Sequence, residues 1–188
     1  MRIKDFIQNV LFFLALIAAF ILLRTFVFTP VVVSGHSMDP NLSNGERVIA
    51  LKNQEIRRFS IVTLRIPDEH GDKINYVKRV IGLPGDTIQY MEDVLYVNGQ
   101  PVHEPFLNEY KEHLPEQELF TNDFSLSHLT GVEQVPAGKY FVLGDNRPLS
   151  KDSRSFGFVD KNEIFGVVRF AFWPLNRFGP VSDIYESN

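Results

Sequence analysis

The hydrophobic pattern divides the chain into one long apolar run near the N-terminus and a series of short alternating segments after it. The run from Val10 to Leu23 contains no polar residue, and further apolar residues extend it on both sides. Its length is close to the roughly 20 apolar residues that a membrane-spanning helix needs. We therefore predict that residues 1–29 form a single transmembrane anchor.

A cleaved signal peptide is the alternative interpretation of this run. Such a peptide has an apolar region of about 7–15 residues, followed by a cleavage site with small residues. The stretch 23–28 offers no such site, which favours an uncleaved anchor. Arg2 and Lys4 precede the run, and Arg24, which can reach the head groups, follows it. This charge distribution predicts a cytoplasmic N-terminus and an extracytoplasmic remainder.

Short segments rich in β-branched residues follow the anchor and predict strands. They are bounded by polar or Gly/Pro stretches, and Asn98-Gly99 is a strong hairpin signal. We therefore predict a mainly β fold, with an antiparallel sheet domain over residues 30–182 behind the N-terminal transmembrane helix. The predicted strands are residues 47–51, 60–65, 75–81, 87–90, 94–97, 139–143 and 167–173.

The sequence changes character between Pro101 and Gly131. This stretch is rich in Glu, is interrupted by Pro, and shows neither a helical nor a strand period. We expect it to be exposed and poor in regular structure, and we place an inserted, loop-rich subdomain at about 98–138.

Composition and charge narrow the possible functions. The 188 residues suit one domain with an appendage, and the apolar content of 44% can fill a core. The net charge of −4 argues against a nucleic-acid-binding protein, which would carry a basic patch. The chain has no cysteine, so disulfides, a thiolate nucleophile and thiolate metal sites are excluded.

The stretch from Val31 to Leu42 contains a possible nucleophile. Three consecutive valines predict an extended entry, Ser34-Gly35 favours a bend, and Pro40 prevents a helix from continuing. A hydroxyl held on such a turn after a strand is one way to expose a reactive serine, and Ser37 is the candidate. Ordinary turns have the same composition, so this interpretation depends on finding a base.

Histidine is the first base to consider. His36 is adjacent to Ser37, but neighbouring side chains on an extended chain point to opposite faces. The other histidines lie in or beside polar stretches, which are poor places to preorganise a Ser-His-Asp triad. The chain also lacks a Ser-x-x-Lys motif, and Asp39 breaks the Gly-x-Ser-x-Gly pattern. These other histidines are His70, His103, His113 and His128.

Lys78 is the second possible base because it lies inside an apolar strand. Alternation places it on the same face as Tyr76 and Val80. If that face is buried, desolvation lowers the pKa of the amine, and a neutral lysine can accept a serine proton. A lysine on the solvent face of an edge strand is the alternative.

The stretch from Gly144 to Arg154 combines two acids, Asp145 and Asp152, with two arginines in a loop rich in Gly, Pro and Ser. Ion pairs among these residues can hold the loop rigid, although a solvated turn has the same composition. Ser150 or Ser153 could orient a neutral amine by hydrogen bonding.

Together these three stretches resemble the type I signal peptidases, which are membrane-anchored serine proteases that remove export signals. The residues that carry the resemblance are Ser34-Gly35-His36-Ser37-Met38-Asp39-Pro40, Tyr76 to Asp86, and Gly144 to Arg154. The resemblance includes the anchor and covers most of the chain outside the insertion.

The resemblance implies that Ser37 is the nucleophile and Lys78 the general base of a Ser/Lys dyad. In this family the backbone N–H of the nucleophile stabilises the oxyanion, and some members add a serine hydroxyl two positions earlier. That earlier position is Gly35 here, so an oxyanion hole built on backbone N–H groups is expected. Supporting roles are implied for Ser150, which would position the lysine amine, and for the ion pairs Asp145–Arg79 and Asp152–Arg154. Asn41 and Glu46 depart from the Thr and Asp common in the family.

The implied activity is removal of N-terminal signal peptides through an acyl-enzyme, without a metal ion or cofactor. The implied partners are exported preproteins with small residues at the first and third positions before the cut, together with membrane lipid and no nucleic acid. The implied location is the cell membrane, with the catalytic domain outside the cytoplasm. A self-cleaving repressor of the same fold and an inactive membrane-anchored binding domain are the alternatives. The former would carry a DNA-binding domain instead of an anchor.

Aromatic residues near the end of the last long strand could contact the membrane surface. Packing in the core is the more frequent reason for aromatic residues on an alternating strand. The residues concerned are Phe170, Phe172, Trp173 and Phe178.

Overall fold

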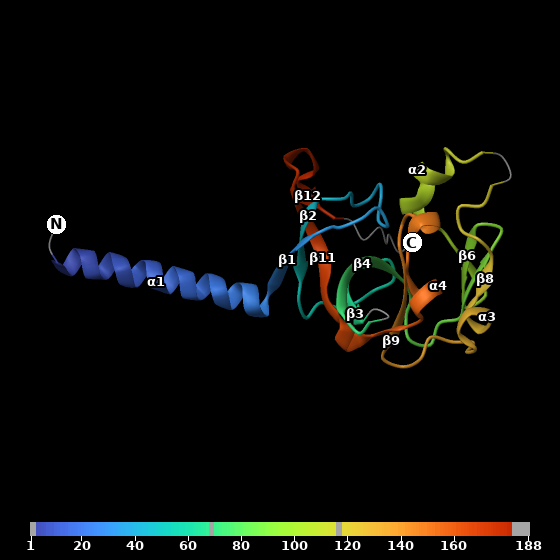
Figure 1. The fold of residues 1–188 in the computed structure, drawn as a ribbon, viewed down its shortest axis with the longest axis horizontal. Coiled ribbons are helices and arrows are strands. Elements are labelled where there is room, and N and C mark those ends of the chain that lie inside the picture. Colours follow the sequence, from blue (N-terminus) through green and yellow to red (C-terminus); the bar gives the residue numbers. More distant parts are fainter. Residues whose placement is uncertain (1–2, 68–69, 116–117, 182–188) are drawn as a thin grey trace.

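A computed structural model describes residues 3–67, 70–115 and 118–181. It consists of one long N-terminal helix and two antiparallel sheets (Figure 1). The predicted mainly β fold behind an N-terminal apolar helix is therefore confirmed. Arg2, which contributed to the predicted orientation, and residue 182, the predicted end of the domain, lie outside the described residues.

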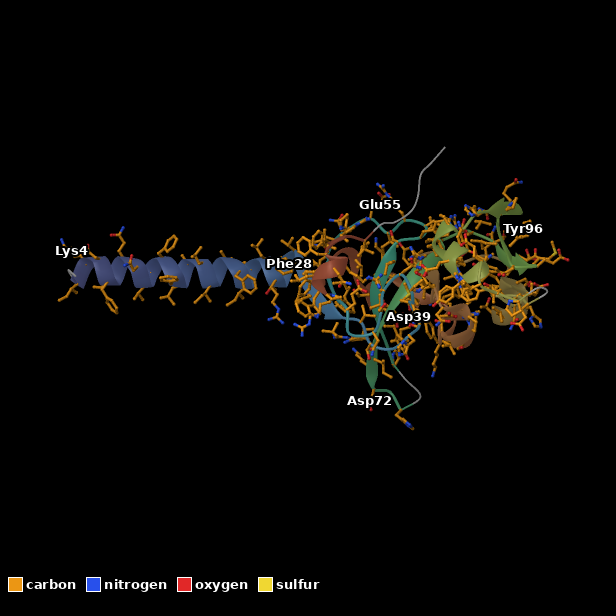
Figure 2. The ribbon with its side chains drawn as sticks, turned by 90° about the horizontal axis from the view of Figure 1, so that it is seen from above. Lys4, Phe28, Asp39, Glu55, Asp72 and Tyr96 are labelled. Carbon is orange, nitrogen blue, oxygen red and sulfur yellow. The ribbon has the colours of Figure 1, made fainter. Side chains whose placement is uncertain are left out.

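Helix α1 (Ile3–Phe26) is long and apolar enough to cross a membrane, with a mean hydropathy of 2.6 over its best 18-residue window. None of its residues is buried against the rest of the chain. Figure 2 shows the helix projecting away from the sheets, with side chains exposed on all sides. A helix that is apolar all around but unpacked is suited to a lipid environment.

The larger sheet has eight strands in the order β1-β2-β11-β3-β4-β9-β10, and β12 pairs with β11. Every pairing in it is antiparallel. Its strands are β1 (Phe28–Val32), β2 (Arg47–Leu51), β3 (Ile61–Pro67), β4 (Lys73–Gly82), β9 (Lys139–Leu143), β10 (Val159–Asp160), β11 (Ile164–Trp173) and β12 (Gly179–Pro180).

The smaller sheet has four strands in the order β7-β6-β5-β8. Asn98 and Gly99, with φ of +53° and +75°, form the predicted hairpin turn between β6 and β7. The strands of the smaller sheet are β5 (Ile88–Met91), β6 (Val94–Val97), β7 (Gln100–Val102) and β8 (Phe124–Ser125). The short helices are η1 (Pro105–Leu107), α2 (Asn108–Lys111), α3 (Leu126–Thr130), η2 (Arg147–Leu149), α4 (Ser153–Phe156), η3 (Lys161–Glu163) and η4 (Leu175–Arg177).

The seven predicted strands all occur, and three of them (β2, β6 and β9) have the predicted bounds. The strands that the sequence pattern missed are β7, β8, β10 and β12, of two or three residues, and β1, for which only an extended entry was expected. Segments this short contain too few residues for an alternation to be detected.

The expectation that residues 101–131 are exposed is wrong for much of this stretch. It supplies several buried apolar residues to a core shared with β5, β6 and β9. These residues do not follow a helical or strand period, because turns and short helices bring them to the core one or two at a time. They are Phe106, Leu107, Phe120, Phe124 and Leu126. The bounds of an inserted subdomain at about 98–138 stay a prediction, and the smaller sheet itself begins earlier, at Ile88.

Strand β4 is central to the arrangement because it lies between β3 and β9. Lys78 pairs with Val62 of β3, and Arg79 pairs with Leu143, the last residue of β9. The chain that leaves β9 therefore starts beside Lys78. This register brings two of the three motif stretches together.

Candidate active site

Ser37 lies in the turn after β1, within residues 31–42, here called the nucleophile segment. Gly35 has a φ of +85°, a left-handed conformation that favours glycine, and its N–H donates to Asn44 Oδ1 at 3.0 Å. Met38, directly after the serine, is 1% exposed and anchors the turn in the core. The backbone is thus held on both sides of Ser37, while Ser37 itself stays half-buried.

Lys78 of β4 reaches the serine from the centre of the larger sheet. Its Nζ lies 2.6 Å from Ser37 Oγ and 5.4 Å from the centre of the Tyr76 ring. The lysine is 2% exposed, so its amine is withdrawn from bulk water. A serine hydroxyl and a buried amine at hydrogen-bond distance have the geometry of a nucleophile and its base.

Burial changes the protonation of this amine. Desolvation lowers the pKa of Lys78 from 10.5 to about 8, because the charged form loses its hydration. The carboxylates of Asp152 and Asp145 act in the opposite direction and raise the pKa, whereas Arg154 lowers it. The lysine can therefore exchange a proton near neutral pH, as a general base must.

Residues 144–154 are here called the loop segment. They hold the turn that contains Ser37 against β4. Asn146 makes this connection twice: its backbone N–H donates to the carbonyl oxygen of Ser37 at 3.0 Å, and its Nδ2 donates to that of His36 at 3.1 Å. The nucleophile segment is thus bound to the loop that follows β9. Asn146 was not singled out from the sequence.

Arg154 and Asp152 form a bidentate ion pair within the loop segment. Arg154 Nε and Nη2 donate to the two carboxylate oxygens of Asp152 at 2.9 and 2.8 Å. Asp152 also accepts the backbone N–H of Gly144 at 3.1 Å. The carboxylate of Asp152 therefore links Gly144 and Arg154, which are the two ends of the loop segment.

Arg79 and Asp145 form a second bidentate pair, which is completely buried. Arg79 Nε and Nη2 donate to the two oxygens of Asp145 at 2.8 and 2.6 Å. Asn41 of the nucleophile segment donates to the same carboxylate at 2.9 Å. The structure thus joins β4, the loop segment and the nucleophile segment at one carboxylate.

Ser150 is near these residues, but the structure does not join it to Lys78. Among the residues that the structure describes, its buried Oγ has no hydrogen-bond partner. A Cβ at Gly144 would collide with this hydroxyl and with the carbonyl oxygen of Ser37. Only glycine fits at 144, and the positioning of the lysine amine by Ser150 stays a prediction.

The histidines are not brought to the serine. His36 Nδ1 lies 2.7 Å from Asp39 Oδ2 on the surface, and His113 Nδ1 lies 2.7 Å from the carbonyl oxygen of Glu109. Within residues 3–67, 70–115 and 118–181, no hydrogen bond joins a histidine to Ser37. The same residues contain no group of three or more His, Asp or Glu side chains that could hold a metal ion.

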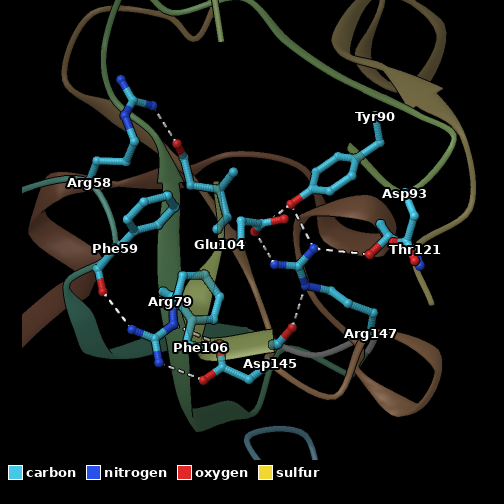
Figure 3. A network of polar contacts seen from close by, with 12 residues as sticks. Arg58, Phe59, Arg79, Tyr90, Asp93, Glu104, Phe106, Thr121, Asp145 and Arg147 are labelled. Atoms are coloured by element: carbon cyan, nitrogen blue, oxygen red, sulfur yellow. Dashed lines mark hydrogen bonds and ion pairs between the residues drawn. The ribbon is translucent and has the colours of Figure 1, made fainter. Parts of the chain in front are cut away.

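Several residues in the stretch 101–131 support the site, and the sequence did not identify them. Figure 3 shows Glu104 and Phe106 pointing toward Arg147 and Arg79, respectively. Glu104 and Arg147 are 43 positions apart, so local patterns contain no signal for their contact. A buried acid in a stretch that looks exposed can be found only from the fold.

The family model, the related sequences and the solved structure that match this chain all describe one family of proteins. A family model described as "Signal peptidase, peptidase S26" matches residues 4–173. Signal peptidase I of Bacillus caldolyticus is 50% identical over 160 residues, which cover 83% of this chain and 85% of that protein. Signal peptidase IB of Staphylococcus aureus is 43% identical over 162 residues, which cover 81% of this chain and 82% of that protein. The crystal structure of a signal peptidase I from Enterococcus faecalis matches with a TM-score of 0.55 and 43% identity, over 61% of this chain and 97% of that chain.

Proposed function

The chain belongs to the peptidase S26 family of signal peptidases, which remove signal peptides, and we propose that it does so with Ser37 as nucleophile and Lys78 as general base. The observation that carries this proposal is the 2.6 Å distance between Ser37 Oγ, which is half-buried, and Nζ of the buried Lys78. The lowered pKa of the lysine supports it, since a neutral amine is needed to accept the serine proton.

The reaction proceeds through an acyl-enzyme. Neutral Lys78 takes the proton of the Ser37 hydroxyl, and Oγ forms a bond to the scissile carbonyl carbon. The lysine then gives this proton to the leaving nitrogen, the peptide bond breaks, and the signal peptide remains as an ester on the serine. In the second half the lysine takes a proton from water, which attacks the ester, and returns the proton to the serine.

The oxyanion is stabilised by backbone donors, above all the N–H of Ser37. Gly35 brings no side-chain hydroxyl, and its own N–H is already donated to Asn44. The turn around Ser37 is held on both sides, by Met38 in the core and by Asn146 on the serine carbonyl. A donor held in this way needs no reorganisation when charge develops.

Ser150 positions the lysine amine during this cycle. Its buried hydroxyl has no partner among the described residues, which is an unusual state for a buried polar atom. A free hydroxyl beside Gly144 is available to the amine when the amine changes its protonation state. The pairs Arg79–Asp145 and Arg154–Asp152 hold the loop that carries it.

The protein is a single-pass membrane enzyme with its N-terminus in the cytoplasm. Lys4 at the start of α1 and Arg24 in its last turn frame the apolar span. Trp173, Leu175 and Phe178 are exposed close to β12, which lies on the side of the domain that α1 joins (Figure 1). Their exposure supports a contact with lipid, whereas Phe170 and Phe172 are half-buried in the fold.

The substrates are exported preproteins with small residues at the first and third positions before the cut. We expect the protein in detergent to process such a preprotein at one site. Replacing the residue directly before the cut by Phe should lower kcat/KM by about 100-fold, because a shallow apolar subsite rejects a large side chain. Gel analysis with mass determination of the products tests this. Equal cleavage of both preproteins would contradict the predicted selectivity.

The pH dependence of cleavage reports on the base. We expect kcat/KM to rise with pH and level off above about 8, because Lys78 acts when neutral and its pKa is about 8. His36→Ala should keep both the rate and this limb, since His36 contacts Asp39 and not the serine. A limb that disappears in His36→Ala would show that histidine is the base instead.

A further inference from the structure

The segment from Glu104 to Phe106 connects β7 to α2 and reaches into the site from outside all three motif stretches. It contacts each of them: the nucleophile segment, the loop segment, and residues 76–86, here called the lysine segment. Figure 3 shows the contacts of this segment with Arg147 and Arg79. Glu104 and Phe106 are both buried.

Glu104 holds the loop segment through Arg147. Arg147 Nη2 donates to Glu104 Oε1 at 2.5 Å, and the two side chains are 0% and 3% exposed. Tyr90 donates its hydroxyl proton to the same carboxylate oxygen at 2.8 Å, and burial keeps the Tyr90 pKa well above its ordinary value, so the phenol stays neutral. Among the residues that the structure describes, Glu104 is therefore the carboxylate that pairs with Arg147, and Asp145 adds a weaker attraction.

Arg147 also contacts both ends of the loop segment to which it belongs. Its Nε donates to the carbonyl oxygen of Gly144 at 3.0 Å, and its own carbonyl oxygen accepts Arg154 Nη2 at 2.6 Å. Gly144 and Arg154 are the two ends of the loop segment. Removing the charge of Glu104 would leave a buried guanidinium without its carboxylate, which is costly in a low-dielectric interior.

Phe106 holds the other two segments. Its carbonyl oxygen accepts Asn41 Nδ2 at 3.0 Å, and its ring lies 3.9 Å from the guanidinium carbon of Arg79. Phe59 packs edge-on against the same ring at 5.1 Å between centroids. A guanidinium over an aromatic face is a cation–π contact, which fixes the plane of Arg79 and thereby the direction of its bidentate pair.

We propose that Glu104 and Phe106 are positioning residues that hold the nucleophile, lysine and loop segments in the register that the Ser/Lys reaction requires. This inference rests on the proposed function. Both side chains are buried, and the contacts that the structure gives them are to other protein groups. Their effect reaches the reaction through Arg147, Arg79 and Asn41.

Two conservative variants test the proposal. Glu104→Gln keeps the size and one acceptor oxygen but removes the charge, and Phe106→Leu removes the ring from Arg79 but keeps the backbone carbonyl. We expect each to lower kcat for preprotein cleavage by about 100-fold and to change KM less than about threefold, because small displacements of reacting groups mainly affect kcat. Phe158→Leu is the matched control, since Phe158 packs on the same core cluster through Phe141 and not through Glu104, Phe106 or their partners.

Titration of the lysine gives a second readout that does not depend on activity. The Lys78 resonance in 15N-lysine-labelled protein is identified by its loss in Lys78→Met. We expect its pKa to rise in Glu104→Gln and Phe106→Leu, because desolvation is the largest cause of the lowered value and a loosened site admits water. The groups that face this amine are Ser37, Tyr76, Asp145, Asp152 and Arg154.

The possible outcomes distinguish a failure of the positioning role of Glu104 and Phe106 from a failure of the proposed function. If the variants lose no more activity than Phe158→Leu at the same melting temperature and the lysine pKa is unchanged, Glu104 and Phe106 are ordinary core residues and the inference is overturned. If the wild-type protein processes no preprotein, the proposed function fails. The lysine titration then still decides whether the two residues position the amine.

Discussion

Replacing Lys78 by Met should abolish preprotein processing and at the same time make the protein more stable. Cleavage should fall by about 10⁴-fold or more, because the base acts on the nucleophile as one unit. The free energy of unfolding should rise by about 1–3 kcal/mol at pH 7, since methionine fills a similar volume without a buried amine. Denaturation in detergent, followed by the fluorescence of Trp173, the single tryptophan, measures the second effect.

The pH dependence of this stabilisation identifies its cause. The folded pKa of Lys78 is about 8, below the value of about 10.4 expected for an unfolded chain. The unfolded state therefore binds more protons between these pH values, and wild-type stability rises with pH across that interval. The advantage of Lys78→Met should accordingly be greatest below pH 8 and shrink as the pH approaches 10.

Two further variants complete this test. Ser37→Ala should abolish cleavage without the gain in stability, because it removes no buried charge. Lys139→Met removes a lysine whose ion pair with Asp160 is partly solvent-exposed, with side chains 37% and 48% exposed, so activity should be kept and stability should change by less than about 1 kcal/mol. Normal processing by Lys78→Met would show that another group is the base.

The sequence predicts the parts of this site that depend on local patterns. Alternation in β4 predicts that Lys78 shares a face with Tyr76, and the structure places the amine 5.4 Å from that ring. Strands such as β2 and β9 are long enough and sufficiently rich in β-branched or aromatic residues to be recognised. The turn at Gly35 is also encoded locally, since its positive φ favours glycine.

Contacts between distant residues could not be predicted in this way. Phe106 contacts Asn41, 65 positions earlier, and Glu104 contacts Arg147, 43 positions later. The stretch that contains both is rich in charged residues and prolines, which are usually exposed. Burial of Glu104 is possible only because the fold supplies both a guanidinium and a phenol, and neither is visible in the local sequence.

The second large effect is expected at the buried pair Arg79–Asp145. Asp145→Ala should lower the free energy of unfolding by about 3–5 kcal/mol, because it leaves the Arg79 charge uncompensated in the core. Glu55→Ala is the control, since its pair with Arg57 has side chains that are 71% and 68% exposed, and it should cost less than about 1 kcal/mol. Urea denaturation of both variants measures the difference. Equal losses would mean that the buried pair is screened like a surface pair.

A double replacement separates stability from positioning at this pair. Arg79→Met combined with Asp145→Leu removes both charges and should recover most of the stability lost in Asp145→Ala, because a buried ion pair gains little over well-packed apolar residues. Cleavage should nevertheless stay low, since Asn41 loses the carboxylate that joins the nucleophile segment to the loop. Stability without activity would mean that the pair orients the residues around Ser37 and Lys78. Recovery of both properties would instead limit the pair to holding the fold together.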